Sequence, residues 1–421
     1  MKTQDRYHEA IYEQLKTLRD FTAIINSTLD LEDLMKIVME KAKAEMQAEA
    51  CSILFYNRNT KKLEFEVALC NDESTCEILK EKIYIELGQG IAGWVALHQE
   101  PLYVEDVQKD SRFFKGADQA TGFVTKSIIA FPLIGRRGLI GVAEIINPAR
   151  RDYDKDIFVA LCKQFAIAIE NALLFKESLE RERLKQELEI ASSIQKSFLP
   201  EQPFFNRGDY TVRAINIPAY AIGGDIYDFV ELSNDRFGVL IGDISGKGIS
   251  AALYMAKAIS DFRHVSLKYD TVSGTMEAMN AIIANAPRGI FLTSIYMIFP
   301  INGPLIEYVN AGHLPMIHID KSGKVKVIEY VSGPPLGIVP MSYTASEIML
   351  NGAERLILLT DGVIDAKDKK GRHLGFEEVV SFIKKNHKAE RLIDMLADFA
   401  NHIAEGQQRV DDITIMEVKR R

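Results

Sequence analysis

Four acidic clusters in the second half of the sequence have residue types and spacing suited to chemistry. Each lies at the end of a strand-like run, beside glycine or another acid: 223–228 (GGDIYD), 242–248 (GDISGKG), 360–362 (TDG) and 411–412 (DD). Glycine next to such an aspartate lets the backbone come close to a ligand. Converging carboxylates repel one another unless cations lie among them. The pattern therefore predicts a site for hard divalent ions such as Mg²⁺ or Mn²⁺, which prefer oxygen ligands.

Each cluster alone has a simpler interpretation. Asp361-Gly362 is a common turn sequence, and Asp411-Asp412 could cap a strand. The segment 242–248 could cradle a phosphate, although it does not satisfy the G-x-x-x-x-G-K-[ST] pattern. The occurrence of all four clusters in this order favours a joint site. Two ions that share a water would lower its pKa and hold a phosphoryl oxygen.

Strands and helices of the second half must position these clusters. Strands are predicted over 209–216, 237–242, 294–299, 305–310, 355–360 and 413–418. Helices are predicted over 250–267, 272–286, 375–387 and 390–405. This order predicts an α+β fold with strands stacked in two sheets and helices outside.

With these clusters in place, residues 200–421 resemble the metal-dependent PPM-type protein phosphatases of the SpoIIE-like branch. The four clusters carry the resemblance, together with 310–315 (NAGHLP), 333–337 (GPPLG) and the lead-in 190–200. It implies an α-β-β-α sandwich over 201–421, two antiparallel sheets flanked by helices.

The resemblance also implies the roles of single residues. Asp225 and Asp243 are expected to be metal ligands and to be catalytic through metal-bound water, with Asp243 bridging two Mn²⁺ or Mg²⁺ ions. The carbonyl of Ile244 is a further expected ligand, and Asp361 and Asp412 are expected to complete the set of ligands around the second ion. The implied reaction is in-line attack of water on phosphoserine or phosphothreonine, without a phospho-enzyme intermediate.

Other polar residues near these motifs are not expected to bind the ions directly: Asp228, Ser245, Lys247 and Asp411. His313 could serve as a general acid for the leaving oxygen. Because it follows a strand at a turn, a structural role is favoured.

The first half has helical patterns and predicted strands at 50–56, 62–68, 101–106, 127–134 and 139–146. Residues 20–175 resemble a GAF domain through 88–95 (GQGIAGWV), 101–106, 127–134 and 141–147, which implies a six-stranded antiparallel sheet with a pocket. Some GAF domains bind cyclic nucleotides, and 112–125 is similar to those. Their N-K…F-x-x-x-D-E signature is poorly met, because Asn147 precedes Pro148. A cyclic nucleotide, another small ligand and a ligand-free dimerisation domain remain alternatives.

A single long helix is predicted from residue 154 to about 198. Its apolar stripe shifts after Leu179, at a charged stretch, and such a broken heptad changes local supercoiling. The predicted organisation is an N-terminal helix (1–19), the GAF domain (20–175), a coiled-coil linker (176–200) and the phosphatase domain. A homodimer through the linker and GAF helices is expected, with a solvated single helix as the alternative.

Composition and charge reduce the number of function classes to be considered. The chain of 421 residues has 51 basic and 59 acidic residues, a net charge of −8 that argues against nucleic acid as a partner. The polar N-terminus, the absence of an apolar run long enough for a bilayer and the lack of a zinc-like cysteine pattern predict a cytoplasmic protein without a membrane partner. The favoured function is a GAF-regulated serine/threonine phosphatase acting on an anti-sigma-factor antagonist or similar phosphoprotein.

Two other classes were weighed against the phosphatase. A diguanylate cyclase would need Gly-Gly-Asp/Glu-Glu-Phe where the chain has Gly-Gly-Asp-Ile-Tyr, and it would leave the later clusters unexplained. A catalytically silent phosphatase-fold scaffold, acting by ligand-dependent protein binding, is the second alternative. The presence of all four expected aspartates favours the enzyme.

Overall fold

The computed structural model describes most of the chain in two compact units, Met1–Arg183 and Leu184–Arg421, which are considered separately. The described residues are Arg19, Ala23, 30–69, 83–149, 155–233, 235–404, Arg409 and 411–421. The helix predicted over 1–19 lies outside this part of the chain, apart from Arg19.

The first unit is built on a six-stranded antiparallel sheet of order β3-β2-β1-β6-β5-β4. Its strands are β1 (Ala48–Asn57), β2 (Lys62–Leu69), β3 (Tyr84–Glu86), β4 (Leu102–Val104), β5 (Ile128–Gly135) and β6 (Gly138–Pro148). Its helices are α2 (Leu31–Glu45), α4 (Gly90–His98), the 3₁₀ turn η1 (Val107–Lys109), α5 (Gly116–Thr121) and the start of α6 (Lys155–Lys196). The predicted sheet and the hairpin between β5 and β6 are confirmed.

Apolar periodicity decides which elements cover each face of this sheet. Asp30 caps α2 by accepting hydrogen bonds from the N–H groups of Glu32 and Asp33, which satisfies donors at the helix start. The buried stripe of α2 packs with the start of α6 on one face of the sheet. The apolar α4 packs on the other face, together with the segment around Phe113 and Phe114.

Helix α6 is continuous over 42 residues, as predicted. Leu161, Phe165 and Ile169 are buried in the core of the first unit, whereas Leu179 and Leu184 farther along are exposed. By length and composition alone, Phe158–Lys196 would suffice to cross a membrane, contrary to the expectation that no segment is long enough. The buried stripe in its first half accounts for part of this apolar character.

The second unit contains two antiparallel sheets, with orders β15-β12-β11-β10-β9 and β14-β13-β16-β17-β8-β7. The first sheet comprises β9 (Asp225–Leu232), β10 (Arg236–Ile244), β11 (Leu292–Pro300), β12 (Leu305–Ala311) and β15 (Ser346–Met349). The second comprises β7 (Phe204–Arg207), β8 (Tyr210–Ile217), β13 (Met316–Ile319), β14 (Val325–Ile328), β16 (Arg355–Leu359) and β17 (Ile413–Arg420). The helices are α7 (Ile249–Lys268), α8 (Val272–Ile283), α9 (Asp361–Ile364), α10 (Phe376–Asn386) and α11 (Leu392–Ile403).

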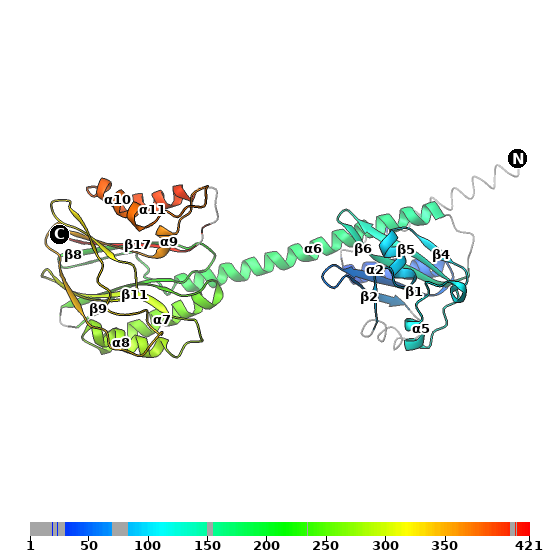
Figure 1. Cartoon of the computed structure of the whole chain (residues 1–421), viewed down its shortest axis with the longest axis horizontal. Coiled ribbons are helices and arrows are strands. Elements are labelled where there is room, and N and C mark those ends of the chain that lie inside the picture. The colour runs from blue at the N-terminus through cyan, green and yellow to red at the C-terminus, as the bar shows by residue number, and fades with distance from the viewer. Residues whose placement is uncertain are drawn as a thin grey trace. The chain divides into compact units, whose positions relative to one another are not determined.

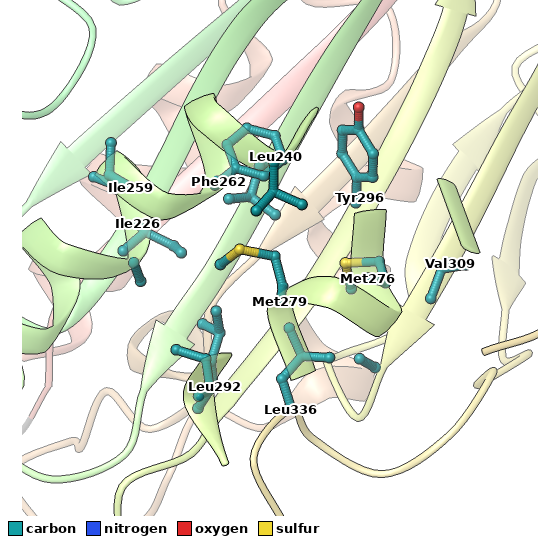
Figure 2. Close-up of a cluster of buried hydrophobic side chains, with 14 of the residues drawn as sticks. Ile226, Leu240, Ile259, Phe262, Met276, Met279, Leu292, Tyr296, Val309 and Leu336 are labelled. Atoms are coloured by element: carbon teal, nitrogen blue, oxygen red, sulfur yellow. The ribbon is translucent and has the colours of Figure 1, made fainter. Parts of the chain in front are cut away.

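These elements form four layers. Helices α7 and α8 lie against the first sheet, and α10 and α11 lie beyond the second (Figure 1). Figure 2 shows the contact of α7 and α8 with the first sheet, where Phe262 and Met279 lie among side chains of β9, β10 and β11. A separate apolar cluster fills the space between the sheets. The predicted α+β fold and its layers are therefore confirmed.

Candidate metal centre

The predicted aspartates come from neighbouring strand ends of the two sheets. Asp225 begins β9 and lies directly opposite Asp243 near the end of β10. Asp361 begins α9 immediately after β16, and Asp412 directly precedes β17, the strand paired with β16. Hydrogen bonds join the two sheets at this point, since Thr360 and Thr414 of the second sheet both contact Asp225 of the first. The structure thus brings the four clusters together.

Two threonine hydroxyls fix the carboxylate of Asp225. Thr360 Oγ1 donates to Asp225 Oδ2 over 2.8 Å, and Thr414 Oγ1 donates to the same oxygen over 2.5 Å. Asn216 Nδ2 donates in turn to Thr414 Oγ1 over 2.8 Å. Both hydroxyls bind Oδ2, so neither of them occupies Oδ1. The sequence patterns assign no role to either threonine, although each stands within two residues of a predicted aspartate.

Backbone N–H groups hold Asp412. Its Oδ1 accepts from Ala219 N over 2.8 Å and its Oδ2 from Gly224 N over 2.7 Å. A Cβ at Gly223 would lie only 2.0 Å from Asp412 Oδ2. Glycine at this position therefore makes room for the carboxylate, which is a more specific reason than the general backbone access predicted from the sequence.

Asp411 lies near enough to the other acids to act on their charge, although it was not expected to bind the ions directly. Its carboxylate pairs with Lys247 Nζ over 2.8 Å. Burial raises the pKa of Asp243 and of Asp361, and the charge of Asp411 adds to both shifts. Asp361 Oδ1 is buried and lacks a hydrogen-bond partner among the described residues. An unpaired buried oxygen of this kind is costly and is expected to have a ligand in the working protein.

The electrostatics of the cluster favour a cation. Burial and the neighbouring carboxylates of Asp361, Asp411 and Asp412 raise the pKa of Asp243 to about 8. Burial, followed by the charge of Asp243, raises the pKa of Asp225 well above its usual value. Each carboxylate thus disfavours the ionised form of the next, and a divalent ion among them would reverse this effect.

The donor set fits the chemistry of Mg²⁺ or Mn²⁺, but the side chains are not in a ligating arrangement. Within the described ranges, no group of three or more His, Cys, Asp or Glu side chains is placed to hold a metal ion. The available donors are carboxylate and carbonyl oxygens, including the carbonyl of Ile244, next to the carboxylate of Asp243. Such donors suit hard cations. Binding would require the carboxylates to rotate toward a common point.

Two other residues singled out from the sequence, Asp228 and Ser245, have structural partners. Asp228 is buried, and both of its oxygens accept hydrogen bonds from Arg263, whose Nη2 also donates to the carbonyl of Phe198. Ser245 Oγ donates to Gly289 O and accepts from Phe291 N. These contacts give both residues partners within the protein, and that neither binds an ion directly stays a prediction.

His313 is also held structurally. Its Nδ1 lies 3.0 Å from Thr293 Oγ1, and its backbone N–H donates to Asn310 Oδ1. Burial lowers its pKa to about 4. At such a pKa the ring is neutral near pH 7 and carries no proton to give as an imidazolium, so the structural role stays the favoured interpretation.

Gln195, in the last turn of α6, contacts the same loop as Asp412. Gln195 Nε2 donates to Gly223 O over 2.6 Å, and Gly223 N donates to Gln195 Oε1 over 3.0 Å. The sequence indicated a resemblance for the whole lead-in segment 190–200, but it gave no functional role to Gln195 itself. The end of the linker helix is thus bonded to the glycine that makes room for Asp412.

Comparison with known proteins agrees with both resemblances. A model of the stage II sporulation protein E (SpoIIE) family matches residues 233–421, and a GAF domain model matches residues 30–169. The SiaA-PP2C domain of Pseudomonas aeruginosa has a similar fold, with a TM-score of 0.50 and 16% identity, covering 57% of this chain and 98% of that domain.

Two curated relatives have similar sequences. Protein IcfG of Synechocystis sp. is 27% identical over 266 residues, which cover 56% of this chain and 41% of that protein. Phosphoserine phosphatase RsbP of Bacillus subtilis is 30% identical over 187 residues, covering 43% of this chain and 46% of that protein. The chain thus spans less than half the length of these relatives. From its motifs and these matches, the chain joins a GAF domain to a phosphatase domain of the SpoIIE family.

Proposed function

We propose that the second unit is a Mn²⁺- or Mg²⁺-dependent protein serine/threonine phosphatase under the control of the GAF domain. The observation that carries the proposal is the meeting of Asp225, Asp243, Asp361 and the 411–412 pair at one end of two stacked sheets. A buried set of mutually repelling carboxylates has no structural benefit without a cation, because it destabilises the ionised forms.

The carboxylates of Asp225, Asp243, Asp361 and Asp412 and the carbonyl of Ile244 would hold two ions. When bound, the ions lower the pKa of a shared water and withdraw charge from a phosphoryl oxygen. The chain itself contributes the positioning of the ligand carboxylates. The two threonine hydroxyls fix Asp225, and the backbone N–H groups of the 219–224 segment fix Asp412.

Asp411 is the alternative to Asp412 as a direct ligand of the ion. Both oxygens of Asp412 already accept backbone hydrogen bonds, whereas Asp411 has Lys247 as its ion-pair partner and acts on the pKa of Asp361. Asp411→Asn and Asp412→Asn separate the two assignments. The direct ligand is the one whose loss weakens Mn²⁺ binding without lowering the thermal stability of the second unit.

The substrate proposed is a phosphoserine or phosphothreonine in a small signalling protein of the anti-sigma-factor-antagonist type. The similarity to a protein named a phosphoserine phosphatase supports this class. We further propose a cytoplasmic homodimer joined through the linker and GAF helices. Exposed Leu179, Leu184 and Leu188 on α6 provide apolar surface for that contact, and sedimentation of the full chain measures the oligomeric state.

The phosphatase proposal is tested by hydrolysis of p-nitrophenyl phosphate and of phosphoserine peptides by the full chain, with Mn²⁺ and with EDTA. Asp243→Asn should abolish activity, and calorimetry should show weaker Mn²⁺ binding. Asp398→Asn, at an exposed position on α11, is the matched control and should change neither. Activity that survives EDTA or Asp243→Asn would refute the metal mechanism.

The same measurements separate the enzyme from a silent scaffold. A scaffold would lack hydrolysis under every condition, including the full chain with phosphoprotein substrate and saturating Mn²⁺. An enzyme held inactive by its GAF domain would still bind Mn²⁺ through Asp243, so the binding arm distinguishes it from a chain that has lost the metal site.

Regulation is proposed to pass through α6. The helix ends at the Gln195–Gly223 contact, so a change in its position would act on the loop that holds Asp412. Inserting residues near Arg181 shifts the phase of the helix and should uncouple regulation while leaving the fold intact. Regulation that is unchanged by the insertion would rule out this route.

A further inference from the structure

A cavity of about 70 Å³ lies inside the first unit, between the sheet and the α4–α5 side. Its floor includes Ser52 of β1 and Glu144 of β6, which are paired across the two strands. Its walls include Phe65, Phe113 and Phe114. Since one water needs about 10–15 Å³ on this measure, the space would accommodate roughly five waters or a small ring compound.

Glu144 is the unusual residue of this cavity. Its side chain is 7% exposed, and the one hydrogen bond it has among the described residues comes from Ser52 Oγ, which donates to Oε2 over 3.0 Å. A buried carboxyl group needs several donors or a positive charge to be stable in its ionised form. One hydroxyl donor leaves that requirement unmet, and burial raises the pKa of Glu144 to about 7.

The other polar side chains of the cavity are used by the protein itself. Both oxygens of Asp118 accept from Thr125, over 2.9 Å from the backbone N–H and 2.6 Å from the hydroxyl. Thr121 Oγ1 donates to Ala117 O over 2.7 Å. These bonds fix the segment that closes the cavity, and they leave Glu144 as the polar group available to a ligand.

The charge of the lining excludes one class of ligand and favours another. Among the described residues, the cavity is lined by two acids and by no Lys, Arg or His. A phosphate or carboxylate would meet the acids without a cationic side chain to balance it. Aromatic rings and a carboxyl group together favour a flat compound with N–H donors, since such a group pairs with the carboxylate while its body contacts the rings.

We propose that this cavity binds a small flat compound, uncharged or cationic, whose N–H groups donate to Glu144. An amidine, a guanidine and an aromatic amine have this chemistry, and a cyclic nucleotide with its anionic phosphate does not. This proposal depends on the proposed function in one respect, which is that the ligand is taken to be the signal that regulates the phosphatase. Binding itself is measured without any phosphatase assay, so the two proposals fail independently.

The test titrates the full chain with benzamidine and the smaller acetamidine by calorimetry, and with benzoate, cyclic GMP and cyclic AMP for comparison. At least one amidine should bind, and benzoate should bind about tenfold more weakly or not at all. Glu144→Gln should weaken amidine binding about tenfold, because the amide carries no negative charge. Glu100→Gln removes an exposed carboxylate of the same unit and is the matched control.

Hydrogen exchange locates the ligand without relying on a variant. Amidine binding should slow exchange in peptides covering β1 and β6. The proposal is overturned if neither amidine binds at millimolar concentration, if Glu144→Gln binds amidine as wild type does, or if cyclic nucleotides protect the same strands.

Discussion

Replacing Glu144 by glutamine should stabilise the first unit at neutral and alkaline pH. In the folded unit burial raises the pKa of Glu144 from 4.5 to about 7. Below pH 4.5 the side chain is protonated in both states, so its contribution is fully present there. As pH rises toward 7, the unfolded chain ionises first, and stability falls by about 1.4 kcal/mol per pH unit.

The loss is complete just above pH 7 and amounts to about 3 kcal/mol for a shift of this size. Glu144→Gln keeps the shape, lets its carbonyl accept from Ser52, and does not ionise. The variant should therefore lack this pH dependence, and at about pH 8 the first unit should melt roughly 6–12 °C higher than in wild type.

Trp94 makes the assay specific for the first unit. It is the single tryptophan of the sequence and lies in α4, so its fluorescence follows unfolding of this unit within the full chain. The comparison is wild type, Glu144→Gln and the exposed control Glu100→Gln at a series of pH values. Equal melting of wild type and Glu144→Gln at high pH would refute the reasoning, because it would mean that Glu144 is ionised without cost.

Three further predictions concern the second unit. Thr414→Val removes one of two hydroxyl donors to Asp225, and it should raise the Mn²⁺ dissociation constant about tenfold by calorimetry; unchanged binding would contradict the positioning role. Gln195→Ala removes two hydrogen bonds to Gly223, and it should speed hydrogen exchange in peptides spanning that loop, whereas equal exchange would show that the contact is dispensable. Gly223→Ala places a Cβ 2.0 Å from Asp412 Oδ2, so it should lower activity at least about tenfold by displacing that carboxylate; wild-type kinetics would contradict the close approach.

The layered fold could be predicted from the sequence because its central strands are strongly apolar. Segments such as Phe237–Gly242 and Ser294–Phe299 lie inside buried strands, and the long helices follow a regular apolar stripe. Several edge and short strands were not predicted, although the short edge strand β4 was. β7 and β14 have few buried residues, so they show no clear alternation against which a strand could be recognised.

Strand β9 was missed for a different reason. Its first four residues are the last four of the GGDIYD motif. This motif indicates a ligand cluster and has no pattern typical of a strand. In the structure, Asp225 to Asp228 are buried on consecutive positions. A polar residue at a buried strand start breaks the period-2 pattern, which is how a functional position departs from the local rule.

The aspartates of the site could be located from the sequence, but the role of each one could not be predicted. Asp411 and Asp412 are neighbours on the chain, and successive side chains of an extended segment point in different directions. Which of them faces Asp361 depends on the backbone contacts of Ala219 and Gly224, almost two hundred positions earlier. No local pattern records such a distant contact.

Both units bury carboxyl groups whose ionised forms need compensation, and the two units call for different ligands to provide it. In the second unit, Asp225 is buried with two hydroxyl donors and carboxylate neighbours. Its ionised form therefore needs positive charge, and the clustering of acids makes a divalent ion the effective source. In the first unit, Glu144 is buried alone with one hydroxyl donor. Among the described lining residues, the one further carboxylate that a metal ion there would find is that of Asp118, which is already bonded to Thr125. An organic donor is the partner that fits, so buried acids predict a metal in one unit and an N–H compound in the other.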